Sequence, residues 1–93
     1  APGGISRIYQ ELSMSTAQYI ERRFRANKVY ITEKQRMGHY TRFDLWCGLI
    51  VNVYDTGRVV VQGRIRAFDY YDPLPPIRKI LPFDTAWQFS RAK

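Results

Sequence analysis

The sequence predicts an α+β fold in which one or two helices pack on one face of a curved antiparallel sheet of four to five strands. Two observations lead to this prediction. Residues 49–54 and 58–62 are rich in β-branched and aromatic residues and flank a short polar link with Gly57, which is the pattern of a β-hairpin. Ahead of the hairpin, one segment has apolar residues at helical spacing and others alternate apolar with polar residues.

Residues 16–27 form the first predicted helix. Ser15 and Gln18 have the spacing of a capping box, in which each side chain bonds the backbone of the other residue. Ala17, Ile20 and Phe24 share one face of this helix, which we expect to be buried. Basic residues crowd its last turn, where they either stabilise the negative end of the helix or face phosphate groups. These are Arg22, Arg23, Arg25 and Lys28.

The next predicted strands are residues 28–32 and 39–45, and the polar residues 33–38 between them are expected to form a loop or the end of a hairpin. In the second strand, Thr41, Phe43 and Leu45 alternate with polar residues and should face the core. The opposite side of that strand would carry Tyr40, Arg42 and Asp44. Residues 46–48 then turn the chain into the hairpin.

The two faces of the hairpin differ in chemistry. One face is aliphatic and is expected to lie in the core: Leu49, Val51, Val53, Val59 and Val61. The other face mixes aromatic, amide and guanidinium groups, and we interpret it as a contact surface. A partly solvated sheet face with ordinary polar residues is the alternative, because antiparallel sheets commonly leave one face in water. The residues of this second face are Ile50, Asn52, Tyr54, Arg58, Val60, Gln62 and Arg64.

Beyond Gly63 the pattern is less regular. Residues 64–68 either extend the strand or start a helix, and Pro75 and Pro76 favour a short helix over residues 77–81 with proline in its first turn. The tail, residues 83–93, is not assigned. We therefore expect one domain over residues 1–93, with its core in 13–68 and an undefined segment in 69–93. Because the chain starts with Ala1-Pro2 rather than Met, we expect it to be part of a larger protein.

The composition favours an anionic partner. The net charge is +7, and arginine supplies eleven of the fifteen basic residues. Guanidinium stacks on flat rings and binds phosphate in a bidentate manner, so nucleic acid is the first expected partner and a membrane surface a distant second. Cys47 is the only cysteine, which rules out an internal disulfide and fits a reducing, cytoplasmic location.

Catalysis has little support in the sequence. His39 is the only histidine, and no nucleophile or carboxylate partner for it is indicated. Asp69 and Asp72 are too few for a carboxylate metal site, and turn formation before Pro73 explains them. The chain has no glycine-rich phosphate loop. We therefore expect a binding domain that is not an enzyme, with no catalytic residues, no metal and no cofactor.

Residues 54–64, with their Thr-Gly-Arg turn and the following Val-Val-Val-Gln-Gly, resemble a signature of TATA-binding-protein-like domains. The Gln-Gly version looks closest to the amino-terminal domain of bacterial ribonuclease HIII and to related modules of bacterial defence proteins. The resemblance implies a half-repeat whose concave sheet face binds duplex or RNA–DNA hybrid by shape. It places Ile50, Asn52 and Tyr54 at contact positions before the turn, Arg58 at the basic turn position, and Val60 and Gln62 after it.

The predicted function is nucleic-acid binding by the exposed hairpin face. Tyr54 would stack on a sugar or base, while Asn52 and Gln62 would hydrogen-bond to groove edges or a 2′-hydroxyl. The alternative is a protein-interaction or self-association module, because tyrosine and arginine also populate interface hot spots. The residues expected to neutralise phosphates are Arg42, Arg58, Arg64 and Arg66.

Overall fold

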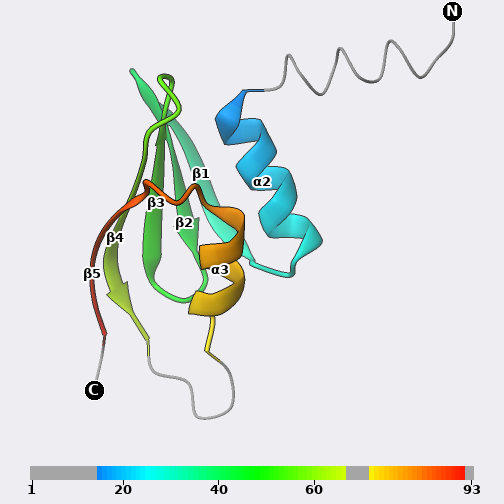
Figure 1. The fold of residues 1–93 in the computed structure, drawn as a ribbon, viewed down its shortest axis with the longest axis vertical. Coiled ribbons are helices and arrows are strands. Elements are labelled where there is room, and N and C mark those ends of the chain that lie inside the picture. The colour runs from blue at the N-terminus through cyan, green and yellow to red at the C-terminus, as the bar shows by residue number, and fades with distance from the viewer. Residues whose placement is uncertain (1–14, 67–71, 92–93) are drawn as a thin grey trace, which may run out of the picture.

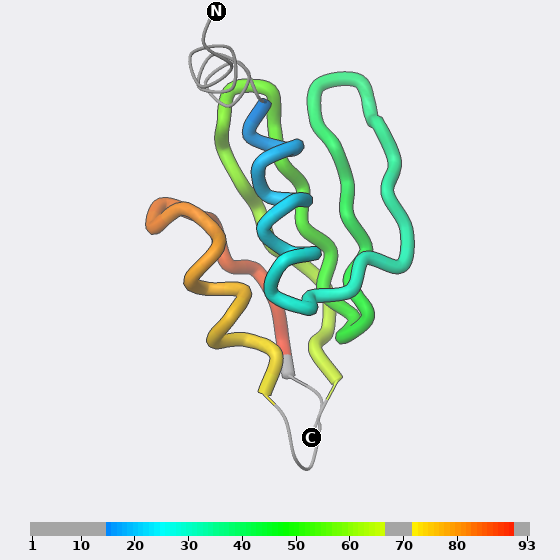
Figure 2. The backbone as a smooth tube through the Cα atoms, turned by 90° about the vertical axis from the view of Figure 1, so that its right-hand side faces the viewer, coloured from blue at the N-terminus to red at the C-terminus, as the bar shows by residue number. Residues whose placement is uncertain are grey.

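The computed structural model describes residues 15–66 and 72–91, and it has the α+β architecture that the sequence predicts. Two helices lie on the same side of one five-stranded sheet (Figures 1 and 2). In the described part of the chain no helix covers the other side. The elements are α2 Thr16–Ala26, β1 Ile31–Met37, β2 Tyr40–Leu45, β3 Leu49–Tyr54, β4 Val59–Ile65, α3 Leu74–Ile80 and β5 Ala86–Arg91.

The strands lie in the order β1-β2-β3-β4-β5. The first four form the predicted antiparallel meander, and β5 pairs with β4 in parallel. A parallel neighbour needs a long crossover connection, and this connection includes α3. The tail could not be assigned from the sequence pattern. In the structure, residues 86–91 of this tail form the fifth strand, at one edge of the sheet.

Helix α2 begins as the sequence predicts. The hydroxyl of Ser15 accepts a hydrogen bond from the backbone N–H of Gln18, and the side chain of Gln18 accepts one from the backbone N–H of Ser15. At the other end, Asn27 caps the helix by donating from its backbone and its side chain to the carbonyl of Arg23. Ile20 and Phe24 are buried against the sheet, so the predicted apolar face is confirmed.

The prediction for the segment after α2 was wrong in its boundaries. Residues 28–30 precede the strand, with Lys28 in the left-handed region at φ 59°, and residues 33–37 are part of β1 rather than a loop. Strand β1 is a sheet edge, where charged residues are common. Its polar side chains find partners across the structure: Lys34 bonds Glu21 of α2, and Arg36 bonds Asp55. These tertiary contacts, which local sequence does not reveal, allow a polar segment to be a strand.

The central hairpin forms between β3 and β4, and its predicted aliphatic face is buried. Gly57 lies in its connection at φ 93°, a conformation that residues with a side chain rarely adopt. The backbone N–H of Tyr54 donates to the carbonyl of Arg58 and closes the loop. Residues 64–68 were expected either to extend the strand or to start a helix, and the structure shows that strand β4 extends to Ile65. Residues 67–71, and with them Asp69, lie outside the described part.

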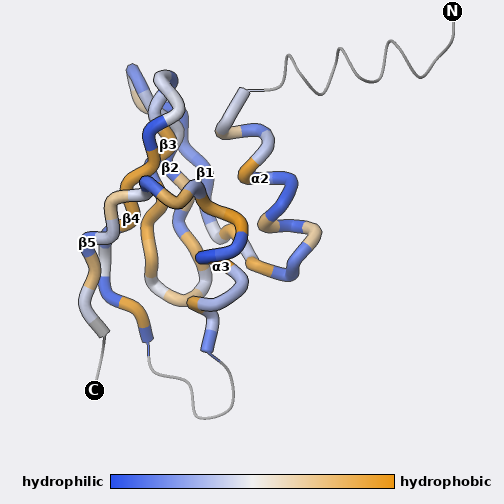
Figure 3. The backbone as a smooth tube through the Cα atoms, viewed as in Figure 1, coloured by the Kyte–Doolittle hydropathy of each residue, from blue (hydrophilic) through white to orange (hydrophobic). Residues whose placement is uncertain are grey.

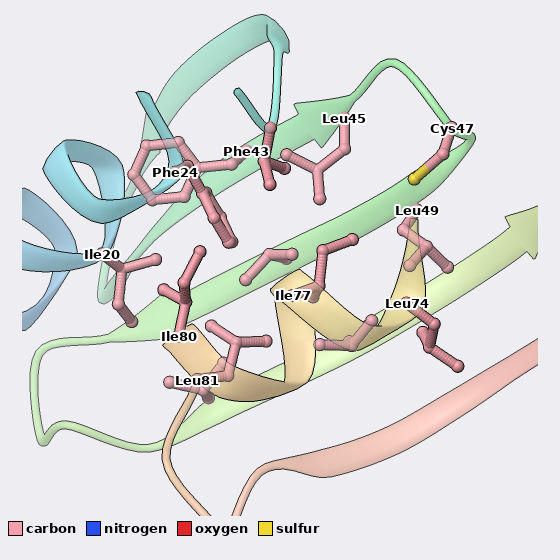
Figure 4. Packing of buried hydrophobic residues seen from close by; sticks show 14 of the residues in the cluster. Ile20, Phe24, Phe43, Leu45, Cys47, Leu49, Leu74, Ile77, Ile80 and Leu81 are labelled. Atoms are coloured by element: carbon pink, nitrogen blue, oxygen red, sulfur yellow. The ribbon is translucent and has the colours of Figure 1, made fainter. Parts of the chain in front are cut away.

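The core fills the space between the helices and the sheet (Figure 4). Phe24 of α2 meets Phe43 of β2 edge to face, with ring centroids 6.5 Å apart. Ile77 of α3 is fully buried on the same side of the sheet. Hydrophobic residues accordingly concentrate on β3 and in α3, while hydrophilic residues mark the hairpin ends (Figure 3).

Helix α3 starts with the expected prolines and packs beside β5. The guanidinium of Arg78 lies 4.7 Å from the ring centroid of Trp87, and Trp87 and Phe89 pack against the core. Trp87 and Phe89 of β5 therefore point to the helix side of the sheet, and Gln88 between them points to the other side. Among residues 15–66 and 72–91, no helix is long and apolar enough to span a membrane.

Candidate functional site

We call the side of the sheet opposite the helices the outer face. The valines on either side of Asn52 are buried in the core, so strand alternation places the Asn52 side chain on this face. In the sheet register, Asn52 lies between Arg42 of β2 and Val60 of β4, and Gln62 lies beside Gln88 of β5. The central residues of the outer face are Tyr40, Arg42, Asp44, Ile50, Asn52, Tyr54, Val60, Gln62, Arg64 and Gln88.

An open hollow of about 530 Å³ lies on the outer face, over β2, β3, β4 and β5. Among the described residues, its lining includes rings, amides and one guanidinium, but no carboxylate. Side chains from four strands and one turn contribute to it, so its shape depends on the register of the whole sheet. It is lined by Tyr40, Asn52, Tyr54, Thr56, Arg58, Val60, Gln62 and Gln88.

Two tyrosines stand side by side at one end of the hollow. Tyr40 and Tyr54 are register partners on β2 and β3, and their ring centroids lie 5.0 Å apart with the planes inclined by 38°. Both side chains are half-buried. A fixed pair of rings with partly open surface is a suitable platform for stacking a flat ligand.

Asn52 is the buried polar residue of the hollow. It is only 6% exposed, and its carboxamide oxygen Oδ1 has no hydrogen-bond partner among the described residues. Leaving a buried acceptor unpaired costs about 1–3 kcal/mol, and such groups are uncommon in folded proteins. An unpartnered acceptor beneath an open hollow is therefore suited to a ligand that brings a donor.

The arginines of the outer face are not equivalent. Arg42 is held by Asp44, with Nε 2.8 Å from Oδ1, and this hydrogen bond raises the pKa of Arg42. By contrast, Arg58, Arg64 and Arg66 are exposed and form no ion pair within residues 15–66 and 72–91. These three guanidinium groups are available to an anionic ligand, while the charge of Arg42 is largely neutralised.

The structure brings five of the nine predicted site residues together in the hollow. The other four differ in position: Arg42 and Ile50 share the outer face beside the hollow, Arg64 lies further along β4, and Arg66 follows the end of that strand. The five residues that line the hollow are Asn52, Tyr54, Arg58, Val60 and Gln62.

Three further residues of the hollow were not among the predicted site residues. Tyr40 could have been included, because alternation already placed it on the non-core side of its strand. Thr56 lies in the hairpin turn next to Gly57. Gln88 carried no signal in the sequence, because its position depends on the parallel pairing of β5 with β4.

Helix α2, whose end carries the basic cluster, lies on the side of the sheet opposite the outer face (Figure 2). Within the cluster, Arg25 bonds Glu21, while Arg22, Arg23 and Lys28 are exposed. The sheet lies between this cluster and the hollow. The cluster is therefore not part of the same site.

Cys47 is buried, and burial raises the pKa of its thiol, which disfavours the nucleophilic thiolate. His39 is exposed in the turn between β1 and β2. Among the described residues, no three His, Cys, Asp or Glu side chains lie close enough together to hold a metal ion.

No protein-family model matches the chain, and no curated protein sequence or solved structure matches it significantly. The likeness of residues 54–64 to TATA-binding-protein-like domains therefore remains a prediction from the sequence.

Proposed function

We propose that the domain binds nucleic acid through its outer face. The observation that carries this proposal is the composition of the hollow. It combines a tyrosine pair for stacking, amide groups for hydrogen bonding and the unpaired guanidinium of Arg58, and it has no carboxylate to repel phosphate. Nucleic acid offers the complementary groups: flat bases, polar base edges and a phosphate backbone.

The unpaired arginines support the same ligand. Arg58 lies at the hairpin turn, and Arg64 and Arg66 lie at and just beyond the other end of β4. A backbone crossing the outer face along this strand would meet a cation at each end. The net charge of +7 would further favour encounter with a polyanion.

Fluorescence anisotropy with labelled single-stranded DNA, duplex DNA and an RNA–DNA hybrid tests the proposal. We expect binding at low salt that weakens as salt rises, because bound phosphates release counterions. A matched measurement with a labelled acidic peptide controls for unspecific attraction between opposite charges. Absence of binding to all three nucleic acids at low salt would disprove the proposed function.

Self-association is a second candidate, favoured by β5, beside which the described residues place no further strand. Of the residues in this strand only the last, Arg91, is a charged type, although charges commonly protect exposed edges. An antiparallel contact between two copies of β5 would extend the sheet. Light scattering coupled to size exclusion should then detect a dimer that Ser90→Lys weakens, whereas a monomer at high micromolar concentration would exclude this candidate.

A further inference from the structure

We infer that the ligand of the outer face is a single strand and that one of its bases lies in the hollow, donating an N–H to Oδ1 of Asn52. This inference rests on the proposed function and narrows it. It departs from the duplex implied by the sequence resemblance.

Oδ1 of Asn52 is an acceptor, so it requires a donor from the ligand. Asn52 is only 6% exposed, and its Oδ1 has no partner among the described residues. A phosphate group has no donor to offer at neutral pH. The Watson–Crick edge of each base carries at least one N–H, as an amino or a ring imino group. The unpaired oxygen at the floor of the hollow therefore favours a base over a phosphate as its partner.

The walls of the hollow favour a flat ring. Tyr40 and Tyr54 lie at one end, Val60 and Gln62 contribute from β4, and Gln88 closes the opposite edge. A base that enters between these groups can stack on a tyrosine ring while its edge points to Asn52. Because Oδ1 is covered in the ligand-free structure, the carboxamide or a neighbouring side chain must rotate to complete the bond.

Arg58, the one basic residue among the described residues that line the hollow, is placed to contact the phosphate of the same nucleotide. Arg58 is exposed at the hairpin turn, at the rim near Tyr54. With the base inside, the attached phosphate lies outside the hollow, where a guanidinium can bind it in a bidentate manner. The hollow thus provides separate contacts for the base and for the phosphate of one nucleotide.

A duplex does not present its bases in this way. In a duplex the faces of each base are stacked on neighbours and its Watson–Crick edge is paired. Extruding one base costs a few kcal/mol, so a site of this kind should bind a single strand at least about tenfold more tightly than the matching duplex.

Oligothymidylate is the probe, because thymine has one N–H donor, at N3. Anisotropy titrations compare a thymidine strand, the same strand made of N3-methylthymidine, an abasic strand and the thymidine–adenosine duplex. We expect the methyl group to weaken binding about 2- to 12-fold, the range of one hydrogen bond. Removing the bases should weaken it at least about fivefold, because stacking is lost as well.

The Asn52→Val variant tests whether Oδ1 of Asn52 accepts the hydrogen bond from the base. The variant removes an unpaired buried acceptor from a β-strand, so its folding stability should equal or exceed that of the wild type. It should bind the thymidine and N3-methylthymidine strands equally. Gln35→Val is the matched control, because Gln35 is an exposed amide on edge strand β1 outside the hollow, and this variant should keep the discrimination.

The outcomes separate the inference from the proposed function. Binding of the duplex as tight as that of the single strand, or equal binding of the methylated strand by the wild type, overturns the inference while nucleic-acid binding stands. If Asn52→Val still binds the N3-methylthymidine strand more weakly than the thymidine strand, to the same extent as the wild type, Asn52 is not the acceptor and the inference is likewise overturned. A ribose strand that binds while its deoxyribose equivalent does not would assign the donor to a 2′-hydroxyl and overturn the role of the base. If none of the probes binds, the proposed function of nucleic-acid binding is itself disproved.

Discussion

Tyr40 and Tyr54 face each other across strands β2 and β3, with ring centroids 5.0 Å apart and an angle of 38° between their planes. The two residues are separated by a turn and most of both strands in the sequence, and the antiparallel register makes them neighbours. Their rings form one end of the hollow on the outer face.

Replacing Tyr54 with alanine should weaken binding of single-stranded DNA about 5- to 150-fold, because stacking on an aromatic ring contributes about 1–3 kcal/mol per base. Tyr54→Phe keeps the ring and should bind within about threefold of the wild type, since only the hydroxyl is lost. Tyr19→Ala is the control, because Tyr19 is 53% exposed on the helix side of the sheet. Equal losses in Tyr19→Ala and Tyr54→Ala would contradict the assignment of the outer face.

Arg58→Ala should reduce the salt dependence of binding. Loss of one phosphate contact to a single strand lowers the slope of log K against log salt by about 0.7. Arg22→Ala removes an equally exposed cation from the basic cluster of α2 and should leave the slope unchanged. A reduced slope in Arg22→Ala alone would show that the helix side binds the phosphates. This pair of variants also decides between the two interpretations of the basic cluster that the sequence left open.

Gly63→Ala should destabilise the fold by about 1–3 kcal/mol. Gly63 has φ 113°, and a Cβ atom added there would lie 2.7 Å from the carbonyl oxygen of Gly48. Gly38→Ala is the matched control, because Gly38 has no positive φ and a Cβ there would meet no atom within 4 Å. Urea denaturation of both variants measures the difference, and equal midpoints would contradict the close approach of β4 to the turn after β2.

Phe43→Ala should lower the free energy of unfolding by about 3–5 kcal/mol, the usual cost of deleting a buried phenylalanine. Phe43 is fully buried and contacts Phe24 of α2 edge to face. Phe83→Ala serves as the control, because Phe83 is fully exposed and its loss should change stability by less than about 0.5 kcal/mol. A small effect of Phe43→Ala would mean that α2 does not pack on β2.

Acid should destabilise the domain partly through Glu21. Its hydrogen bond from Lys34, assisted by one from Arg25, holds the pKa of the Glu21 carboxyl below its ordinary value of 4.5. A lowered pKa in the folded state contributes stability above pH 4.5, and this contribution is lost as the pH falls through the folded-state pKa.

Thermal melts of the wild type and Glu21→Gln across the acidic range check this prediction. The melting temperature of the wild type should fall more steeply with decreasing pH than that of Glu21→Gln. Lys34→Met removes the main cause of the shift, so its pH dependence should lie between the two. Parallel curves for wild type and Glu21→Gln would rule out a contribution from this carboxyl.

The sequence by itself determined the elements that depend on neighbouring residues. Strand alternation is a local property of the backbone, so the split of the hairpin into an aliphatic and a polar face followed directly from residues 49–64. The same holds for the capping box of Ser15 and Gln18, whose groups lie three residues apart. These local patterns were enough to place Asn52, Tyr54 and Gln62 on one face.

Only the tertiary structure decided the features that depend on contacts between distant segments. Gln88 reaches the hollow because β5 pairs in parallel with β4 after a crossover, and no local pattern encodes that pairing. The burial of Asn52 became visible only with the neighbouring strands and side chains in place. The boundaries predicted for strand β1 were wrong for the same physical reason: Lys34 and Arg36 are stabilised by Glu21 and Asp55, which are distant in the sequence and adjacent in the fold.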